Sequence, residues 1–196
     1  NRGPSSNRPD ARSFFLLLAG LTMAATLGVA QTASTTYIEG EPSHRLPNGV
    51  SEDLTFGAFV RPGESVITGT YDLAELDQDG AVVRVQPDTV FTIREVERDG
   101  ERESVLTTTV GSVKYRFNRL TGREPRLGTA ATAAGVRGTE LTVYAGTDGS
   151  ALYVVDSGLV SVESAGESVE IGANTGVEVV AGRPPGEPFE VIGREL

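Results

Sequence analysis

The sequence contains no cysteine and no tryptophan, and it has one histidine among 196 residues. The absence of cysteine excludes disulfides, thiolate metal sites and thiol catalysis. The histidine, His44, lies in the proline-bounded segment 42–47, and no serine nucleophile motif accompanies it. We therefore expect no enzymatic activity, no cofactor and no metal site. A hydrolase built on a pair of carboxylates is the alternative, because acidic residues are plentiful.

Long apolar runs are missing everywhere except near the N-terminus. Residues Phe14 to Ala30 carry no charge, and they follow Arg2, Arg8 and Arg12. The run ends in the sequence LGVA, which has small residues where signal peptidase requires them. We interpret residues 1–30 as an export signal. An uncleaved membrane anchor is the alternative, since about 17 apolar residues is near the minimum that spans a bilayer of roughly 30 Å. Both interpretations place the remainder of the chain in the periplasm or another extracytoplasmic compartment, in the second case anchored to the inner membrane.

Positive charge is also scarce. The chain has 17 basic and 27 acidic residues and a net charge of −10, which argues against nucleic acid as a partner. Five basic residues nevertheless fall close together and are opposed only by Glu124. We expect this stretch to form a long exposed loop that binds an acidic envelope protein or an anionic envelope surface, with a solvated hairpin tip as the alternative. The five residues are Lys114, Arg116, Arg119, Arg123 and Arg126.

Helical periodicity is missing from residue 34 onward. Apolar residues alternate with polar ones instead, as in Val83 and Val85 or Phe91 and Ile93, and this pattern predicts about eight short strands. The chain is rich in glycine, and four dipeptides suit tight hairpins because they tolerate positive φ. The sequence therefore predicts one all-β domain over residues 31–185, followed by a tail over 186–196. The four dipeptides are Asn48-Gly49, Asp79-Gly80, Asp99-Gly100 and Asp148-Gly149.

Two acidic segments, 77–80 and 95–103, lie within this pattern. The sequence DQDG at 77–80 begins like a calcium loop, but no glutamate closes it at the required distance. We interpret it as a hairpin turn. Residues 95–103 alternate between acidic side chains and arginines around Asp99-Gly100, and we expect a solvated hairpin end that discourages edge pairing.

The chain also repeats itself. The sequence GESV occurs at 63–66 and again at 166–169, and in both places another glycine follows three residues after the valine. The segments 110–115 and 157–162 resemble each other more weakly, each being a glycine turn followed by an alternating strand. Stacked units of this kind predict a solenoid-like β domain in which equivalent rungs begin with the same turn. A β-sandwich with duplicated hairpins is the alternative.

The stretch AGVRGTELTV at 134–143 resembles the signature of the FecR family, in which a VRGT element leads into a strand. Residues 56–69 are similar to the entry segment of that family and end in the same threonine–glycine pair. Residues 154–162 resemble the hairpin that follows the signature, and residues 166–180 the closing rung. The resemblance covers most of the chain, from about residue 34 to residue 185.

This resemblance implies a compact, solenoid-like β domain that faces the periplasm or the cell exterior. In the regulators of the family, the domain follows a cytoplasmic anti-sigma segment and one membrane helix, and it senses the occupied state of an outer-membrane transporter. Here 13 residues precede Phe14 and 11 follow Pro185, so we expect the β domain without the anti-sigma segment or the C-terminal signalling subdomain. The expected function is non-enzymatic binding of another envelope component, in sensing or signalling. A structural envelope protein that self-associates is the alternative.

Within the signature, we expect Val136, Arg137, Gly138 and Thr139 to be structural. The prediction for Arg137 is a buried guanidinium whose five donors link adjacent rungs, with glycines permitting close backbone approach. The alternative is a guanidinium presented to an anionic ligand.

Overall fold

The computed structural model describes residues 32–98, 100–118 and 126–191, and within these ranges the chain forms fifteen strands and no helix. The all-β prediction is thus confirmed. Among the described residues no helix is long and apolar enough to cross a membrane. The export signal or anchor was predicted for residues 1–30, which lie outside the described ranges.

The strands are more numerous than the sequence pattern predicts, because several have only two or three residues and show no alternation. Their bounds are β1 (Ala33–Glu39), β2 (Ser43–Arg45), β3 (Ser51–Asp53), β4 (Phe59–Val60), β5 (Ser65–Ile67), β6 (Leu73–Gln78), β7 (Ala81–Val85), β8 (Val90–Arg98), β9 (Glu101–Phe117), β10 (Arg126–Gly128), β11 (Ala133–Ala145), β12 (Ala151–Ser164), β13 (Glu167–Gly172), β14 (Thr175–Val179) and β15 (Phe189–Glu190).

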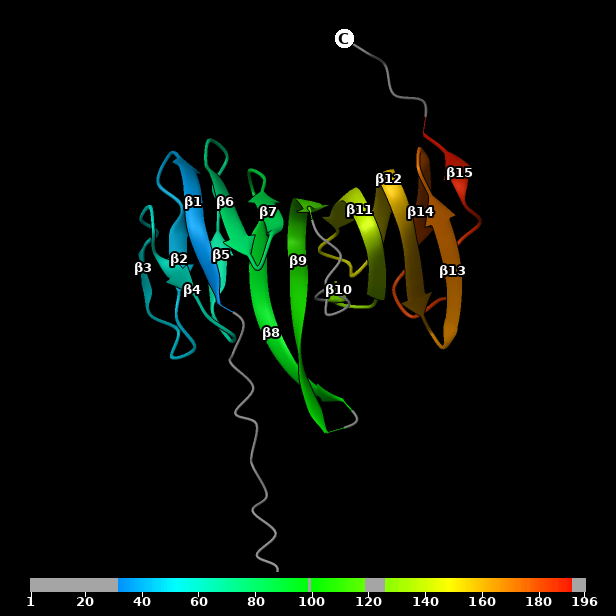
Figure 1. Cartoon of the computed structure of the whole chain (residues 1–196), viewed down its shortest axis with the longest axis horizontal. Helices are drawn as coiled ribbons and strands as arrows, with labels where there is room; N and C mark the ends of the chain where they lie inside the picture. Colours follow the sequence, from blue (N-terminus) through cyan, green and yellow to red (C-terminus); the bar gives the residue numbers. More distant parts are fainter. Residues whose placement is uncertain (1–31, 99, 119–125, 192–196) are drawn as a thin grey trace, which may run out of the picture.

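All fifteen strands belong to one open, mixed sheet, which extends along the longest axis of the molecule (Figure 1). Three long strands change partners partway along their length. One of them, β9, pairs with β8 up to Val110, with β11 from Gly111 on and with β7 from Val113 on. The sheet therefore has two halves. Layer A contains β4, β1, β6, β7, the end of β9, the end of β11, the start of β12, β14 and β15. Layer B contains β3, β2, β5, β8, the start of β9, β10, the start of β11, the end of β12 and β13.

The two layers face each other across a common core. Thr108 and Tyr115 are seven residues apart in β9 and would be about 23 Å apart in a straight strand. Their side-chain oxygens are nevertheless 3.0 Å apart, so the strand folds back between them. Tyr153 in layer A is likewise hydrogen-bonded to Thr132, which adjoins layer B. Buried apolar side chains of both layers form a single cluster. The pairing shows an open sheet folded on itself and does not show the stacked coils of a solenoid.

A glycine with positive φ lies at each fold in a long strand: Gly111 in β9 (φ 91°), Gly138 in β11 (φ 55°) and Gly158 in β12 (φ 87°). The weaker sequence echo aligns Gly111 with Gly158, and both glycines have positive φ. They lie at folds within β9 and β12, however, and not in turns between strands. A Cβ atom on Gly158 would lie 2.4 Å from the carbonyl oxygen of Gly138, so β11 and β12 fold in contact with each other.

The two GESV segments share a turn but not an environment. Both begin with a glycine in the left-handed region and lead into layer B, the first into β5 and the second into β13. Strand β5 lies between β2 and β8, and Glu64, which immediately precedes β5, is buried. Strand β13 pairs with β12 alone among the described strands, and its Glu167 is exposed. The repeat thus marks a common type of turn.

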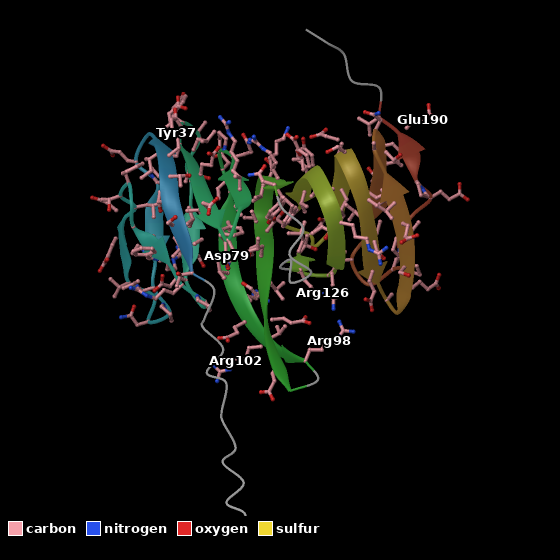
Figure 2. The ribbon with its side chains drawn as sticks, in the orientation of Figure 1. Tyr37, Asp79, Arg98, Arg102, Arg126 and Glu190 are labelled. Carbon is pink, nitrogen blue, oxygen red and sulfur yellow. The ribbon has the colours of Figure 1, made fainter. Side chains whose placement is uncertain are left out.

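The predicted hairpins occur where the dipeptides place them. Asp79 and Gly80 both have positive φ (53° and 88°) and join β6 to β7, so DQDG is a hairpin turn. Figure 1 shows the β8–β9 hairpin extending beyond the rest of the body, and Figure 2 places Arg98 and Arg102 toward its end. The outer residues of β8, from Arg94 on, are exposed, as predicted for a solvated hairpin end. Asp99 lies outside the described residues.

Candidate functional site

The VRGT signature forms the fold of β11. Val136 and Thr139 are buried, whereas Arg137 and Gly138 are exposed. The hydroxyl of Thr139 donates to the carbonyl oxygen of Leu159 in β12 at 3.1 Å and accepts from the backbone N–H of Arg137 at 3.2 Å. The threonine thus satisfies backbone groups that the irregular pairing at the fold leaves open.

The same device recurs at two other points where the chain passes between the layers. The buried Thr68 hydroxyl donates to the carbonyl oxygen of Gln86 at 2.6 Å and accepts from the N–H of Thr89 at 3.0 Å. The buried Thr89 hydroxyl in turn donates to the carbonyl oxygen of Ser112 and accepts from the N–H of the same residue. The signature threonine is therefore one of three that stabilise the layer crossings, which favours a structural role for the motif.

The prediction of a buried guanidinium at Arg137 is wrong, because this side chain is exposed. No carboxylate of the described part of the chain forms an ion pair with it. The exposure of Arg137 could have been predicted from the period-two alternation of the strand. Ala134 and Val136 point into the core, so Gly135 and Arg137 point outward. The alternative, an anionic ligand, stays a prediction.

The basic stretch does not form one loop. Lys114 and Arg116 lie in β9 on the outer face of layer A, and Arg126 lies in β10 of layer B, so the loop prediction is wrong for these three. The alternation of Val113, Tyr115 and Phe117, all buried, keeps the first part in a strand. Arg126 forms an ion pair with Glu163 at 3.6 Å. Arg119 and Arg123 lie outside the described residues.

Lys114 lies between two carboxylates. Its Nζ atom is 2.8 Å from Oε1 of Glu140 and 3.2 Å from Oδ2 of Asp156. The hydrogen bond to Glu140 raises the pKa of Lys114, although partial burial opposes the shift, and the same hydrogen bond lowers the pKa of Glu140. Arg84 of β7 is directly opposite Lys114, and Glu75 of β6 is opposite Arg84. We call these residues, with Arg116, the charged face: Glu75, Arg84, Lys114, Arg116, Glu140 and Asp156.

We expect Lys114→Met to lower the free energy of unfolding by at most about 1 kcal/mol, because solvent screens an ion pair whose lysine side chain is 37% exposed. The loss should shrink as the pH falls through the lowered pKa of Glu140, since protonation removes the attraction in the wild type too. Urea unfolding at neutral and acidic pH measures both effects. Arg84→Met, which removes a cation with no ion pair among the described residues, is the control and should not destabilise by this route.

His44 and Glu64 form a buried pair that sequence reasoning missed. Oε2 of Glu64 is 2.8 Å from Nε2 of His44 and accepts the backbone N–H of Arg61 at 2.7 Å. The pair joins β2 to β5 and fixes the turn before β5. Within the described ranges, no group of three or more histidine or acidic side chains is arranged to hold a metal ion.

A family model described as FecR protein matches residues 64–183. Among solved structures, two crystal structures of a candidate anti-sigma factor from Parabacteroides distasonis ATCC 8503, at 2.50 and 1.65 Å resolution, resemble this chain with TM-scores of 0.54 and 0.53 and 17% sequence identity. The similarity covers 65% of this chain and 59% of the other, and it concerns the fold. A search among curated proteins gives no match. Because the family model covers more than half of its length, this chain belongs to the FecR protein family.

Proposed function

We propose that this chain is the extracytoplasmic domain of a FecR-type signalling system, and that it binds another envelope component without catalysing a reaction. The observation that carries this proposal is the family match over residues 64–183, which includes the VRGT fold and the folds at Gly111 and Gly158. The threonines at the layer crossings support the same view. Because Thr139 of the signature stabilises the fold in the way that Thr68 and Thr89 do, we expect the outer faces of the domain to bind the partner.

The charged face is the contact surface that we favour. Arg84 and Arg116 are exposed on it and have no ion pair within the described residues, while Lys114 is held by two carboxylates. The face carries carboxylates on β6, β11 and β12 and cations on β7 and β9. It therefore suits a protein with a complementary charge pattern better than a uniformly anionic surface. Of the two partners expected from the sequence, an envelope protein is therefore favoured.

The self-associating scaffold gains no support from the edges of layer B. Glu52 and Asp53 are exposed on β3 at one end of layer B, and Glu167 and Glu170 are exposed on β13 at the other. Head-to-tail pairing of copies would bring these carboxylates together, and like charges on edge strands oppose such pairing.

Cross-linking in intact cells tests the proposal, with a photoreactive residue placed at position 82 beside Arg84 and Arg116. We expect an adduct with one distinct envelope protein, and its loss in the double variant Arg84→Glu and Arg116→Glu. Arg45→Glu is the matched control, because Arg45 is exposed on β2 in the other layer, and it should leave the adduct intact. Adducts only between copies of this chain, or an adduct that survives the charge reversal, would contradict the proposal.

A further inference from the structure

We propose that β13 accepts an added strand from another protein, namely an extended segment in which apolar and basic residues alternate. Strand β13 is the end strand of layer B and lies near one end of the molecule (Figure 1). It has six residues, whereas the strands at the other three ends of the two layers, β3, β4 and β15, have two or three. An open strand edge of this length is a template for pairing with another chain.

The backbone of β13 leaves three residues facing the open side. The two residues of the loop 165–166, which joins β12 to β13, both have positive φ. In such a hairpin the first residue after the loop, here Glu167, is bonded to the neighbouring strand, and bonded residues then alternate with unbonded ones. Ser168, Glu170 and Gly172 therefore direct their N–H and C=O groups away from β12. Within the described part of the chain, no other strand or loop bonds to these groups.

Strand β13 has few of the features that protect edge strands from pairing. Its pairing with β12 contains no register shift, and its sequence ESVEIG contains no proline. Its protection comes from Glu167 and Glu170, which are exposed and form no ion pair among the described residues. These carboxylates oppose pairing with a second copy of the same edge, but they attract a strand that carries basic residues.

The side chains of β13 indicate the alternation that the added strand should have. Val169 and Ile171 point toward the core, and Val169 is only partly buried, whereas Glu170 between them points outward. An apolar side chain beside Val169 would extend the core, and a basic side chain beside Glu170 would face its carboxylate. Cross-strand pairs of both kinds stabilise a sheet.

Neighbouring cations leave the middle of this edge acidic. Arg126 of β10 is ion-paired with Glu163 of β12, and Arg137 lies on β11, two strands inside the edge. Arg183 lies at the loop end of β13, where its carbonyl oxygen accepts a hydroxyl of β12 at 2.8 Å. Glu170, in the middle of β13, is opposite a serine of β12. The edge is separate from the charged face, which lies in layer A, and the inference does not depend on that face.

Peptide binding to the full chain tests the proposal. The probe is a synthetic peptide of sequence KVKVKV with blocked ends, and the control is KKKVVV, which has the same composition without the alternation. In NMR spectra of the isotope-labelled chain, we expect KVKVKV to shift the amide signals of Ser168, Glu170 and Gly172 and to slow the exchange of these amides with solvent. KKKVVV should bind about tenfold more weakly, because it cannot place its basic and apolar side chains on opposite faces.

Two substitutions separate backbone pairing from charge. Ser168→Pro removes an N–H that faces the open side, so the chain should still fold. It should bind KVKVKV about tenfold more weakly, because it loses a hydrogen bond and its ring obstructs the added strand. Ser168→Ala is the matched control and should bind like the wild type. Glu170→Gln should weaken binding severalfold and reduce its dependence on salt.

Three results would overturn the proposal. The first is the absence of shifts in β13 on addition of KVKVKV. The second is equal affinity for the two peptides, and the third is unchanged affinity in Ser168→Pro, since attraction by charge alone would then explain the binding. The double variant Arg84→Glu and Arg116→Glu, which should abolish the cross-link described above, should leave the shifts in β13 unchanged. The two proposals therefore fail separately.

Discussion

Gly158→Ala is expected to lower the free energy of unfolding by about 4 kcal/mol, from backbone strain of roughly 1–2 kcal/mol and overpacking of roughly 1–3 kcal/mol. Gly158 has a φ of 87°, where a residue with a side chain is strained. Its Cβ atom would also lie 2.4 Å from the carbonyl oxygen of Gly138 and 2.9 Å from that of Arg137. These are backbone atoms of the neighbouring fold in β11, so relief requires two central strands to separate.

Substitutions at two other glycines separate the cost of backbone strain from the cost of overpacking. Gly166 has a φ of 80°, and nothing lies within 4 Å of its Cβ position, so Gly166→Ala carries the strain without the collision and should cost about 1–2 kcal/mol. Gly135 lies in the same stretch as the signature, without a positive φ and with open space around its Cβ position. Gly135→Ala should be close to neutral. Urea unfolding of the three variants gives the order, and equal losses for Gly158→Ala and Gly166→Ala would show that the two folds do not touch.

The fold of β11 also explains why the signature contains a glycine followed by a threonine. Gly138 has a φ of 55°, in the left-handed region that favours glycine. Thr139 then supplies the hydroxyl that bonds to Leu159 of the neighbouring strand. The glycine and threonine of the signature thus allow β11 to fold beside β12 and to bond to it.

Local chemistry made much of the fold predictable. Period-two alternation identified the strands that hold the core, and Asp79-Gly80 identified a hairpin because its conformation depends on those two residues alone. The folding of long strands was harder to predict. Val110 and Val113 look like parts of separate strands in the sequence, although Gly111 joins them in a single strand that changes partners.

The candidate site was less predictable, because its contacts join distant residues. Nothing local indicates that Glu64 meets His44 across β2 and β5, or that Lys114 meets Asp156 on β12. The cluster of basic residues from Lys114 on suggested a loop. The buried Tyr115 and Phe117 alternate with basic residues, and this alternation, which indicates a strand, was given too little weight. Arg137 shows the opposite case, since its outward orientation followed from the strand pattern, and the expectation of a buried donor disregarded that pattern.

The second large effect concerns alkaline pH. Tyr153 is buried, and burial raises its pKa to about 12, while hydrogen bonding to Thr132 partly opposes the shift. Burial raises the pKa of Tyr115 in the same direction. A tyrosine in the unfolded chain ionises near pH 10, so above that pH the unfolded state binds fewer protons than the folded state and stability falls as pH rises. Below pH 10 this stability is fully present. For Tyr153, the loss by pH 12 amounts to about 2 kcal/mol, at 1.36 kcal/mol per pKa unit.

Tyr153→Phe should therefore have opposite effects in two pH ranges. Near neutral pH the variant loses the hydrogen bond to Thr132 and should be less stable by about 1 kcal/mol. Between pH 10 and 12 it has no phenol to ionise, so its stability should fall less steeply than that of the wild type, and the two curves should cross. Tyr71→Phe removes an exposed tyrosine and should follow the wild type throughout. Urea unfolding across this range measures the difference, and parallel curves for Tyr153→Phe and the wild type would show that the phenol reaches solvent without unfolding the contact between the two layers.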